Sequence, residues 1–266
     1  MYDVKTGKVL FLDGKYEEAR EHFYLGATEG DAEAAFDYGY MLLEGIGGER
    51  DERGAASFFT LASARVGEAC YNLAVMYLHG VGVGRDYRRC YDFMHDAAEM
   101  GVIEAQLYLG VAHTMGALYE PDIIRISLIP YHTPIYRDPY ALLEGDVPDA
   151  EDDEEKRVRT VRLDLVSAFE WFRAAAMHDS DYVEELSQKS KYLFARCFLD
   201  GVGTDYNRDM ANKLMLMAAA DGSADALAYI QTEAPYLLTD PKNRDYVRTI
   251  AAVHDMPLLG GSGEKR

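Results

Sequence analysis

The sequence predicts an all-α fold, a solenoid of about five antiparallel helix pairs with one long insertion in one pair. Three observations support this prediction. A loop with the pattern G-x-G recurs along the chain, a capping Asp or Asn follows it, and apolar residues recur with helical period on both sides. With 266 residues, of which 48% are apolar, the chain is long enough to bury a continuous core.

The G-x-G loops define the register of the repeats. In three copies a G-x-G begins the loop, and a helix-starting residue follows six positions later. An Asp or Asn there can cap the next helix, because its side-chain oxygen accepts hydrogen bonds from the free N–H groups of the first turn. The glycines are Gly45, Gly80 and Gly201, and the capping residues are Asp51, Asp86 and Asn207.

A run of alternate glycines such as Gly80 to Gly84 can also bind phosphate. Loops of that kind follow a strand and open a helix within a βαβ unit. Here the preceding stretch LAVMYLH is helical by its period, and the glycines recur wherever the helices reverse. We therefore interpret them as residues with positive φ at a helix C-terminus, and keep a phosphate site as the alternative.

Each loop is flanked by two kinds of helix. The second-type helix, which follows the capping residue, has one apolar stripe at offsets 4, 7, 8, 11 and 12. The template fits after Asp86, Asn207 and Asp164, fits with one extra residue after Asp51, and fits more loosely after Lys15. The first-type helix, which precedes the glycine, repeats small residues that indicate close approach of a neighbouring helix. The repeating unit is therefore an antiparallel helix pair.

Two stretches carry a family resemblance. CYNLAVMYLHGVGVGRDYRRCYDFMHDAAEMG, residues 70–101, and AFEWFRAAAMHD, with its Trp171–Phe172 pair, resemble Sel-one-like repeats of the tetratricopeptide superfamily. The resemblance covers residues 12–116 and 164–234. It implies that the helix pairs stack into a right-handed α-α superhelix.

These patterns divide the chain into four parts. We expect the solenoid over residues 1–234, interrupted by an insertion over 117–163. Five of the eight prolines lie in this insertion, so it cannot form one long helix. Its apolar half is expected to pack along the solenoid, and its acidic half is expected to be mobile. Residues 235–256 are expected to form a capping helix and residues 257–266 a disordered tail.

Charge and cysteine content argue against several classes of partner. The chain has 27 basic and 46 acidic residues, and its net charge of −19 repels nucleic acids and anionic lipid surfaces. Cys70, Cys90 and Cys197 form no closely spaced pair, which favours a reducing compartment over a disulfide framework. The apolar stretch at 9–12 is too short for a signal peptide or a membrane span. We expect a cytoplasmic protein with no nucleic-acid partner and no membrane insertion.

No motif predicts catalysis, a metal site or a cofactor. The seven histidines lack the spacing of a metal-binding pair, and the acidic run at 149–155 lacks the alternating ligands of a calcium loop. Ser262 lacks the strand and turn that would activate a nucleophile. We therefore predict no catalytic residues, no metal ligands and no cofactor.

The resemblance implies protein recognition. In tetratricopeptide-type arrays the first-type helix of each pair lines a concave groove that contacts partner peptides. The positions carried over onto this chain are largely acidic and aromatic, which favours a basic or apolar-aromatic peptide. The principal groove positions are Phe36, Tyr40, Glu44, Tyr71, Val75, His79, Leu107, Val111, Tyr192 and Arg196. Further positions are Glu33, Leu43, Glu68, Leu78, Glu104, Thr114, Met115, Leu199 and Asp200.

The expected function is therefore a non-enzymatic scaffold that binds a protein or peptide in this groove. The alternative is an enzyme or small-molecule binder with a site between the 117–160 insertion and the solenoid, around Tyr131, His132 and Tyr136. As a further alternative, the insertion itself covers many of the groove side chains, as a lid or a pseudo-ligand.

Overall fold

A computed structural model of the chain describes residues 4–116, 163–178 and 184–253. These residues contain twelve α-helices and one short 3-10 helix, and no strand. The prediction of an all-α solenoid of helix pairs is therefore confirmed. The predictions for the insertion and the tail lie outside the described residues. In the part that the structure describes, none of the helices combines the length and the apolar character that a membrane span requires.

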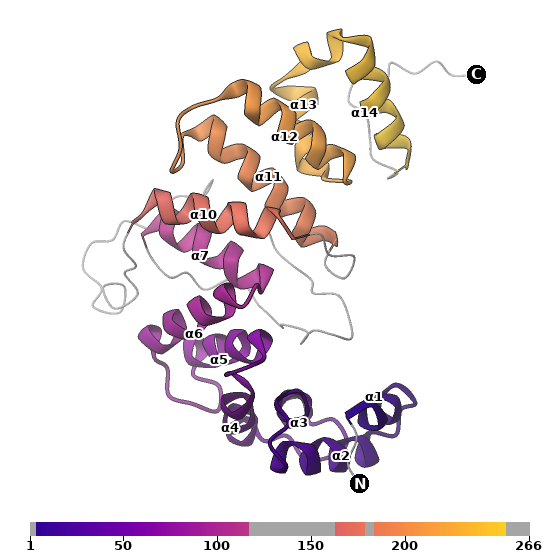
Figure 1. Ribbon diagram of the computed structural model, residues 1–266, viewed down its shortest axis with the longest axis vertical. Coiled ribbons are helices and arrows are strands. Elements are labelled where there is room, and N and C mark those ends of the chain that lie inside the picture. Colours follow the sequence, from indigo (N-terminus) through magenta and orange to yellow (C-terminus); the bar gives the residue numbers. More distant parts are fainter. Residues whose placement is uncertain (1–3, 117–162, 179–183, 254–266) are drawn as a thin grey trace. The chain divides into compact units, whose positions relative to one another are not determined.

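The chain forms two compact units, residues 1–162 and 163–266, which are described separately. In unit 1 each helix packs mainly against its neighbours in sequence, first-type and second-type helices alternating (Figure 1). Its helices are α1 (Val4–Leu12), α2 (Tyr16–Thr28), α3 (Ala32–Glu44), α4 (Glu52–Ala62), α5 (Gly67–His79), α6 (Tyr87–Glu99) and α7 (Ile103–Met115).

Unit 2 continues the same alternation and ends in a cap. The last helix packs against α12 and the 3-10 helix, and its Val247 is buried in the core of this unit. The segment expected as one capping helix is thus a 3-10 turn followed by an α-helix. The elements are α10 (Leu165–Ala176), α11 (Glu184–Asp200), α12 (Arg208–Ala220), α13 (Ala224–Thr232), η2 (Pro235–Thr239) and α14 (Pro241–Val253).

The loop glycines end the first-type helices. Gly45, Gly80 and Gly201 have φ values of 69°, 74° and 68°, a left-handed conformation that L side chains adopt at a cost. The residue after each glycine donates its N–H to the carbonyl five positions back, as Val81 does to Met76 at 3.0 Å. This closes the helix end in the way expected of a left-handed cap.

The predicted capping residues occupy N-cap positions. The Asp51 carboxylate accepts from the Gly54 N–H at 2.9 Å. Asp86 accepts from the N–H groups of the third and second residues after it, and Asn207 accepts from the Met210 N–H at 3.0 Å. Asp164, at the start of α10, makes the same kind of contact. Each loop therefore leads into a helix in which the capping side chain accepts hydrogen bonds from N–H groups of the first turn.

The second glycine of each loop makes the contact between successive helix pairs. A Cβ added to Gly47, Gly82 or Gly203 would overlap the carbonyl group of the first residue in the preceding second-type helix. These first residues are Tyr16 of α2, Glu52 of α4 and Leu165 of α10. The loop of one pair thus packs backbone against backbone on the pair before it, and only glycine fits.

The helices pack through small residues and aromatic rings. Alanines of the second-type stripe, such as Ala55, Ala62 and Ala97, are fully buried and allow close helix approach. Aromatic rings fill the wider spaces between α3 and α4, where Tyr38 and Phe58 lie 4.6 Å apart between ring centroids in a T-shaped pair. These contacts form one continuous cluster from α2 to α6.

The three cysteines belong to this packing. Cys70, Cys90 and Cys197 are all buried and unbridged. Burial raises the thiol pKa of Cys70 to about 11, and those of Cys90 and Cys197 to about 12. Cys90 is fully buried and has a packing role, and none of the three thiols has the low pKa of a reactive cysteine.

The glycine contact predicts a position-specific effect. Gly82→Ala should lower the free energy of unfolding by at least about 2 kcal/mol, because it adds a left-handed strain and an overlap with the Glu52 backbone. Gly14→Ala is the matched control, since Gly14 has a similar left-handed φ and a Cβ there meets nothing within 4 Å. Urea denaturation followed by circular dichroism measures both. Equal destabilisation by the two variants would contradict the contact.

Thiol burial predicts slow labelling. At pH 8 the native protein should react with Ellman's reagent about a hundredfold or more slowly than the unfolded chain, because both access and ionisation are suppressed. All three thiols should react at once in guanidinium chloride. A fast-reacting thiol in the native protein would show that one of these cysteines is accessible.

Candidate functional site

The candidate site is the set of first-type helix positions expected to line a groove. The structure divides this set by burial. Phe36, Tyr71, Leu107 and Val111 are buried, and so are Leu78 and Glu104. Phe36, for example, packs on α4, where its ring centroid lies 5.8 Å from that of Phe59. These side chains belong to the core, so the expectation that they line an open groove does not hold for them.

The remaining positions of unit 1 stay at the surface. Glu33 and Glu44 are exposed, and Tyr40, Leu43, Glu68, Val75, His79, Thr114 and Met115 are half-buried. We call the accessible members on α3 and α5, namely Glu33, Tyr40, Leu43, Glu44, Glu68, Val75 and His79, the α3–α5 face. This face combines aliphatic, aromatic and acidic side chains. Of its seven residues, His79 alone can carry a positive charge.

Tyr40 and Glu44 form the most distinct part of the α3–α5 face. They lie one helical turn apart at the C-terminal end of α3. Partial burial, followed by the nearby Glu44 carboxylate, raises the pKa of the Tyr40 hydroxyl. Tyr40 therefore stays a neutral hydrogen-bond donor beside a carboxylate, with its ring 6.5 Å from that of Phe11.

Glutamates recur at one register position, twelve residues before the loop glycine. These are Glu33, Glu68 and Glu104 on α3, α5 and α7. Glu33 is paired with Lys8 of α1 at 3.0 Å. Burial, and in smaller part the negative charge of Glu68, raises the pKa of Glu104. Successive repeats thus place like charges near one another, which is unfavourable unless a cation joins them.

In unit 2 the groove positions predicted on α11 interact with one another. Arg196 donates to Asp200 at 3.0 Å and to the Tyr192 hydroxyl at 3.1 Å. The Lys189 ammonium lies 5.4 Å from the Tyr192 ring centroid. Charges on this part of α11 therefore pair with each other, in contrast to the acidic α3–α5 face.

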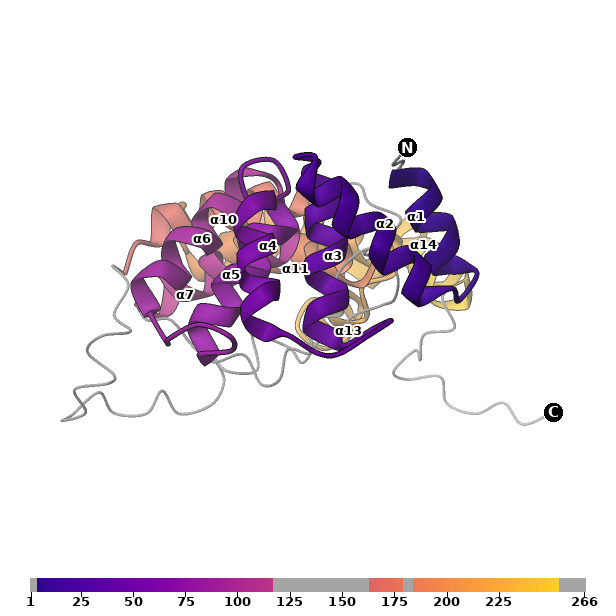
Figure 2. The ribbon, with the colours of Figure 1, turned by 90° about the horizontal axis from the view of Figure 1, so that it is seen from below.

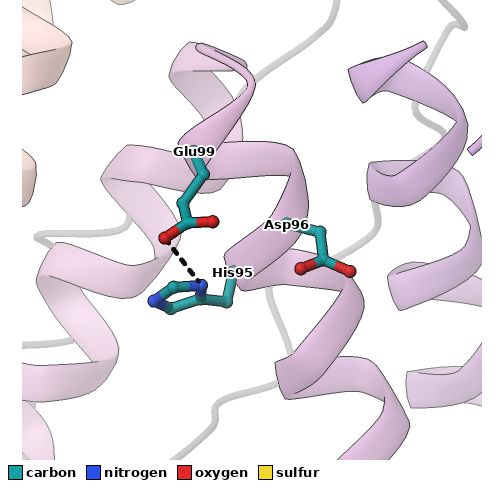
Figure 3. A group of neighbouring side chains, drawn as sticks. All are labelled: His95, Asp96 and Glu99. Atoms are coloured by element: carbon teal, nitrogen blue, oxygen red, sulfur yellow. Dashed lines mark ion pairs between the residues drawn. The ribbon is translucent and has the colours of Figure 1, made fainter. Parts of the chain in front are cut away.

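A group of His95, Asp96 and Glu99 on α6 has metal-binding residue types. Their ligand atoms all lie within 4.8 Å of one another, and His95 Nδ1 is 3.7 Å from Glu99 Oε1 (Figure 3). All three come from one helix, and each side chain is exposed or half-buried. The Asp96 carboxylate lies to one side of the His95–Glu99 pair (Figure 3). This arrangement is that of a surface ion pair, and we assign no metal to it.

The glycine loop after α5 borders a polar cavity of about 610 Å³. If the glycine loop bound phosphate, as in the alternative interpretation, the phosphate would lie in this cavity. The N–H groups of Gly80 and Val81 both bond to the Met76 carbonyl, so they are used within the helix end. Arg50 is paired with Glu52, and every lining residue is exposed or half-buried. The lining residues are Arg50, Asp51, Glu52, Arg53, Gly80, Gly82, Val83 and Gly84. We assign no ligand to this cavity.

A pair of buried polar residues was not predicted from the sequence. Asp37 and Asn72 lie eight positions before Gly45 and Gly80, and so at the same register in α3 and α5. They are 6% and 5% exposed, and Asp37 Oδ2 and Asn72 Nδ2 lack hydrogen-bond partners among the described residues. The available signal was a polar residue at the same register of two successive first-type helices. The alternative site around Tyr131, His132 and Tyr136 lies outside the described residues.

Comparisons with known proteins agree with this architecture. The model of the Sel1 repeat matches residues 32–65, 67–102, 103–125, 159–180 and 189–223. The chain is similar in fold to a crystal structure of a Sel1 repeat protein from Oxalobacter formigenes, with a TM-score of 0.66 and 17% identity. The match covers 94% of this chain and 85% of that one.

A second solved structure extends the comparison. It is c5321, a protective antigen present in uropathogenic Escherichia coli strains that displays an SLR fold, with a TM-score of 0.53 and 22% identity. The match covers 89% of this chain and 41% of that one, so this chain spans less than half of the larger protein. No curated protein sequence matches the chain. Because the repeat model matches more than half of its residues in five copies, the chain belongs to the Sel1 repeat family.

Proposed function

We propose that this protein is a non-enzymatic interaction scaffold that binds a basic or aromatic peptide segment of a partner protein on the α3–α5 face, as part of a concave groove. Sel1 repeat proteins are generally protein-interaction scaffolds, which supports the broad class. The finer proposal rests on the chemistry of this face.

The observation that carries the proposal is that two of the three glutamates of the face have no ion pair within the described part of the chain, whereas Glu33 is paired with Lys8. Glu44 and Glu68 make no ion pair with any cation among the described residues. Exposed carboxylates that have no internal partner attract an external cation and raise its rate of encounter. A Lys or Arg side chain of a partner fits this requirement, and a nucleic acid does not.

Tyr40 and Val75 supply the apolar part of the same surface. Half-buried aromatic rings lose little conformational entropy on binding, because they are already held by packing. The Tyr40 ring beside Glu44 can accept a cation over its face while the carboxylate neutralises it. The combination favours peptides in which basic and aromatic residues alternate.

The core positions have a supporting role in this proposal. Tyr71 and Phe36 hold the helices that present the face, so their truncation would damage the fold together with binding. Accessible positions are therefore the informative ones to change. The buried, unbridged thiols support a reducing compartment, and we place the protein in the cytoplasm as part of the proposal.

Peptide binding tests the proposal directly. Arrays of equal-length peptides that alternate Lys or Arg with Tyr or Trp should retain the protein, and Glu-Tyr arrays of the same length should not. Tyr40→Ala and the double variant Glu44→Gln, Glu68→Gln should each weaken binding by about tenfold, and added salt should weaken it further.

The matched control changes the same charge elsewhere. Glu21→Gln combined with Glu29→Gln alters one exposed carboxylate of α2 and one at its C-cap, and binding should remain at the level of the unchanged protein. Equal retention on acidic and basic arrays, or equal weakening by both double variants, would contradict specific binding at the α3–α5 face.

A further inference from the structure

Asp37 lies on a stripe of α3 that α1 contacts. Glu33, Asp37 and Met41 follow one another at four-residue intervals, so they lie on one side of the helix. Glu33 accepts a hydrogen bond from Lys8 of α1 at 3.0 Å. Met41 lies in a core cluster with Phe23, against which Leu10 and Phe11 of α1 pack. Asp37 therefore lies between Glu33 and Tyr40, the residues of α3 that meet Lys8 and Phe11 of α1. Helices α1, α2 and α3 lie side by side (Figure 2).

This carboxyl is in an unfavourable place for a charge. Its side chain is 6% exposed, and Oδ2 has no hydrogen-bond partner in the described part of the chain. Burial raises its pKa to about 7, Lys8 of α1 opposes that rise, and Glu33 and Asp31 add to it. Among the described residues, α2 contributes no charged group to this balance. Ionised Asp37 can gain hydrogen bonds mainly by gaining water.

We propose that Asp37 makes the docking of α1 on α2 and α3 depend on pH, so that α1 is held firmly in mildly acidic conditions and opens more often at neutral pH and above. The helix is the first element of unit 1 and packs mainly on α2. Its Val9 and Leu12 are more than half exposed. Because α1 packs mainly on one helix, whereas α2 packs on both α1 and α3, local opening of α1 disturbs less of the core.

The direction of the pH dependence of α1 opening follows from proton linkage. In the docked state Asp37 holds its proton up to about pH 7, and in the open state water returns it to its ordinary value of 3.8. Opening therefore releases a proton between these pH values, and its equilibrium constant rises by up to about tenfold per pH unit. The stabilisation from the protonated carboxyl is full below 3.8, falls through this window, and is lost above about pH 7.

Asn72 provides an internal comparison. It lies at the same register of α5, is equally buried, and also has an unpaired polar atom. Its amide does not titrate in this range, so it adds no pH dependence to the packing of α5. The proposal therefore predicts an effect in one repeat and none at the equivalent position of the next. It stands independently of peptide binding.

Hydrogen exchange of the full chain tests the inference. After correction for intrinsic exchange rates, protection of the α1 amides at 8–12 should fall by about a hundredfold between pH 5 and pH 8, and that of α5 should not. In Asp37→Asn the fall in α1 should disappear, because the isosteric amide cannot ionise. A pH-dependent loss of α1 protection that persists in Asp37→Asn would overturn the proposal.

A second variant separates Asp37 from its neighbours. Glu33→Gln breaks the Lys8 pair, so α1 should be less protected at both pH values while the difference between them is kept. If Glu33→Gln removes the difference as Asp37→Asn does, the ion pair is responsible and the proposal is wrong. Equal loss of protection across α2, α3 and α5 would show that the whole unit opens, which also contradicts it.

Discussion

The contact between the second loop glycine and the first residue of the preceding second-type helix sets the spacing of the helix pairs. Gly82 lies on the backbone of Glu52, and Gly47 and Gly203 make the equivalent contacts. Backbone in contact with backbone leaves no adjustable side chain between successive pairs. The alanines of the second-type stripe, the aromatic pairs and the capping residues then pack around this fixed spacing. A helix pair alone is too thin to bury its apolar side, so stability depends on this stacking.

Constant spacing also determines the chemistry of the surface. Residues at one register position of successive first-type helices fall near one another, whatever their charge. Glu68 thus contributes to the raised pKa of Glu104, after the larger effect of burial. In unit 2 the register position of Glu68 holds Lys189, which pairs with Asp225. The position of Glu44 holds Asp200, which pairs with Arg196. The repeat therefore supplies a common frame, and single substitutions within it decide where a charged partner could bind.

Buried polar groups at repeated register positions lower the stability of the fold. Asp37 and Asn72 take register positions where an apolar side chain would pack without penalty, as Leu193 does in α11. An unpaired amide lowers stability by a constant amount, whereas a carboxyl lowers it by an amount that varies with pH. Asp37 lies on the stripe of α3 that α1 contacts, so its burial bears on the pH dependence proposed for α1 docking.

The sequence by itself determined the helices, their order, the glycine corners and the capping residues. Each of these depends on contacts between residues at fixed short offsets, such as Asp86 with the amides just after it. Tertiary structure decided which groove positions are accessible, because the period of a helix does not tell which of its sides another segment covers. Phe36 and Leu107 are therefore buried, while Tyr40 stays at the surface. It also decided that Asp37 is buried on the stripe of α3 that α1 contacts, since those contacts join residues distant in the chain.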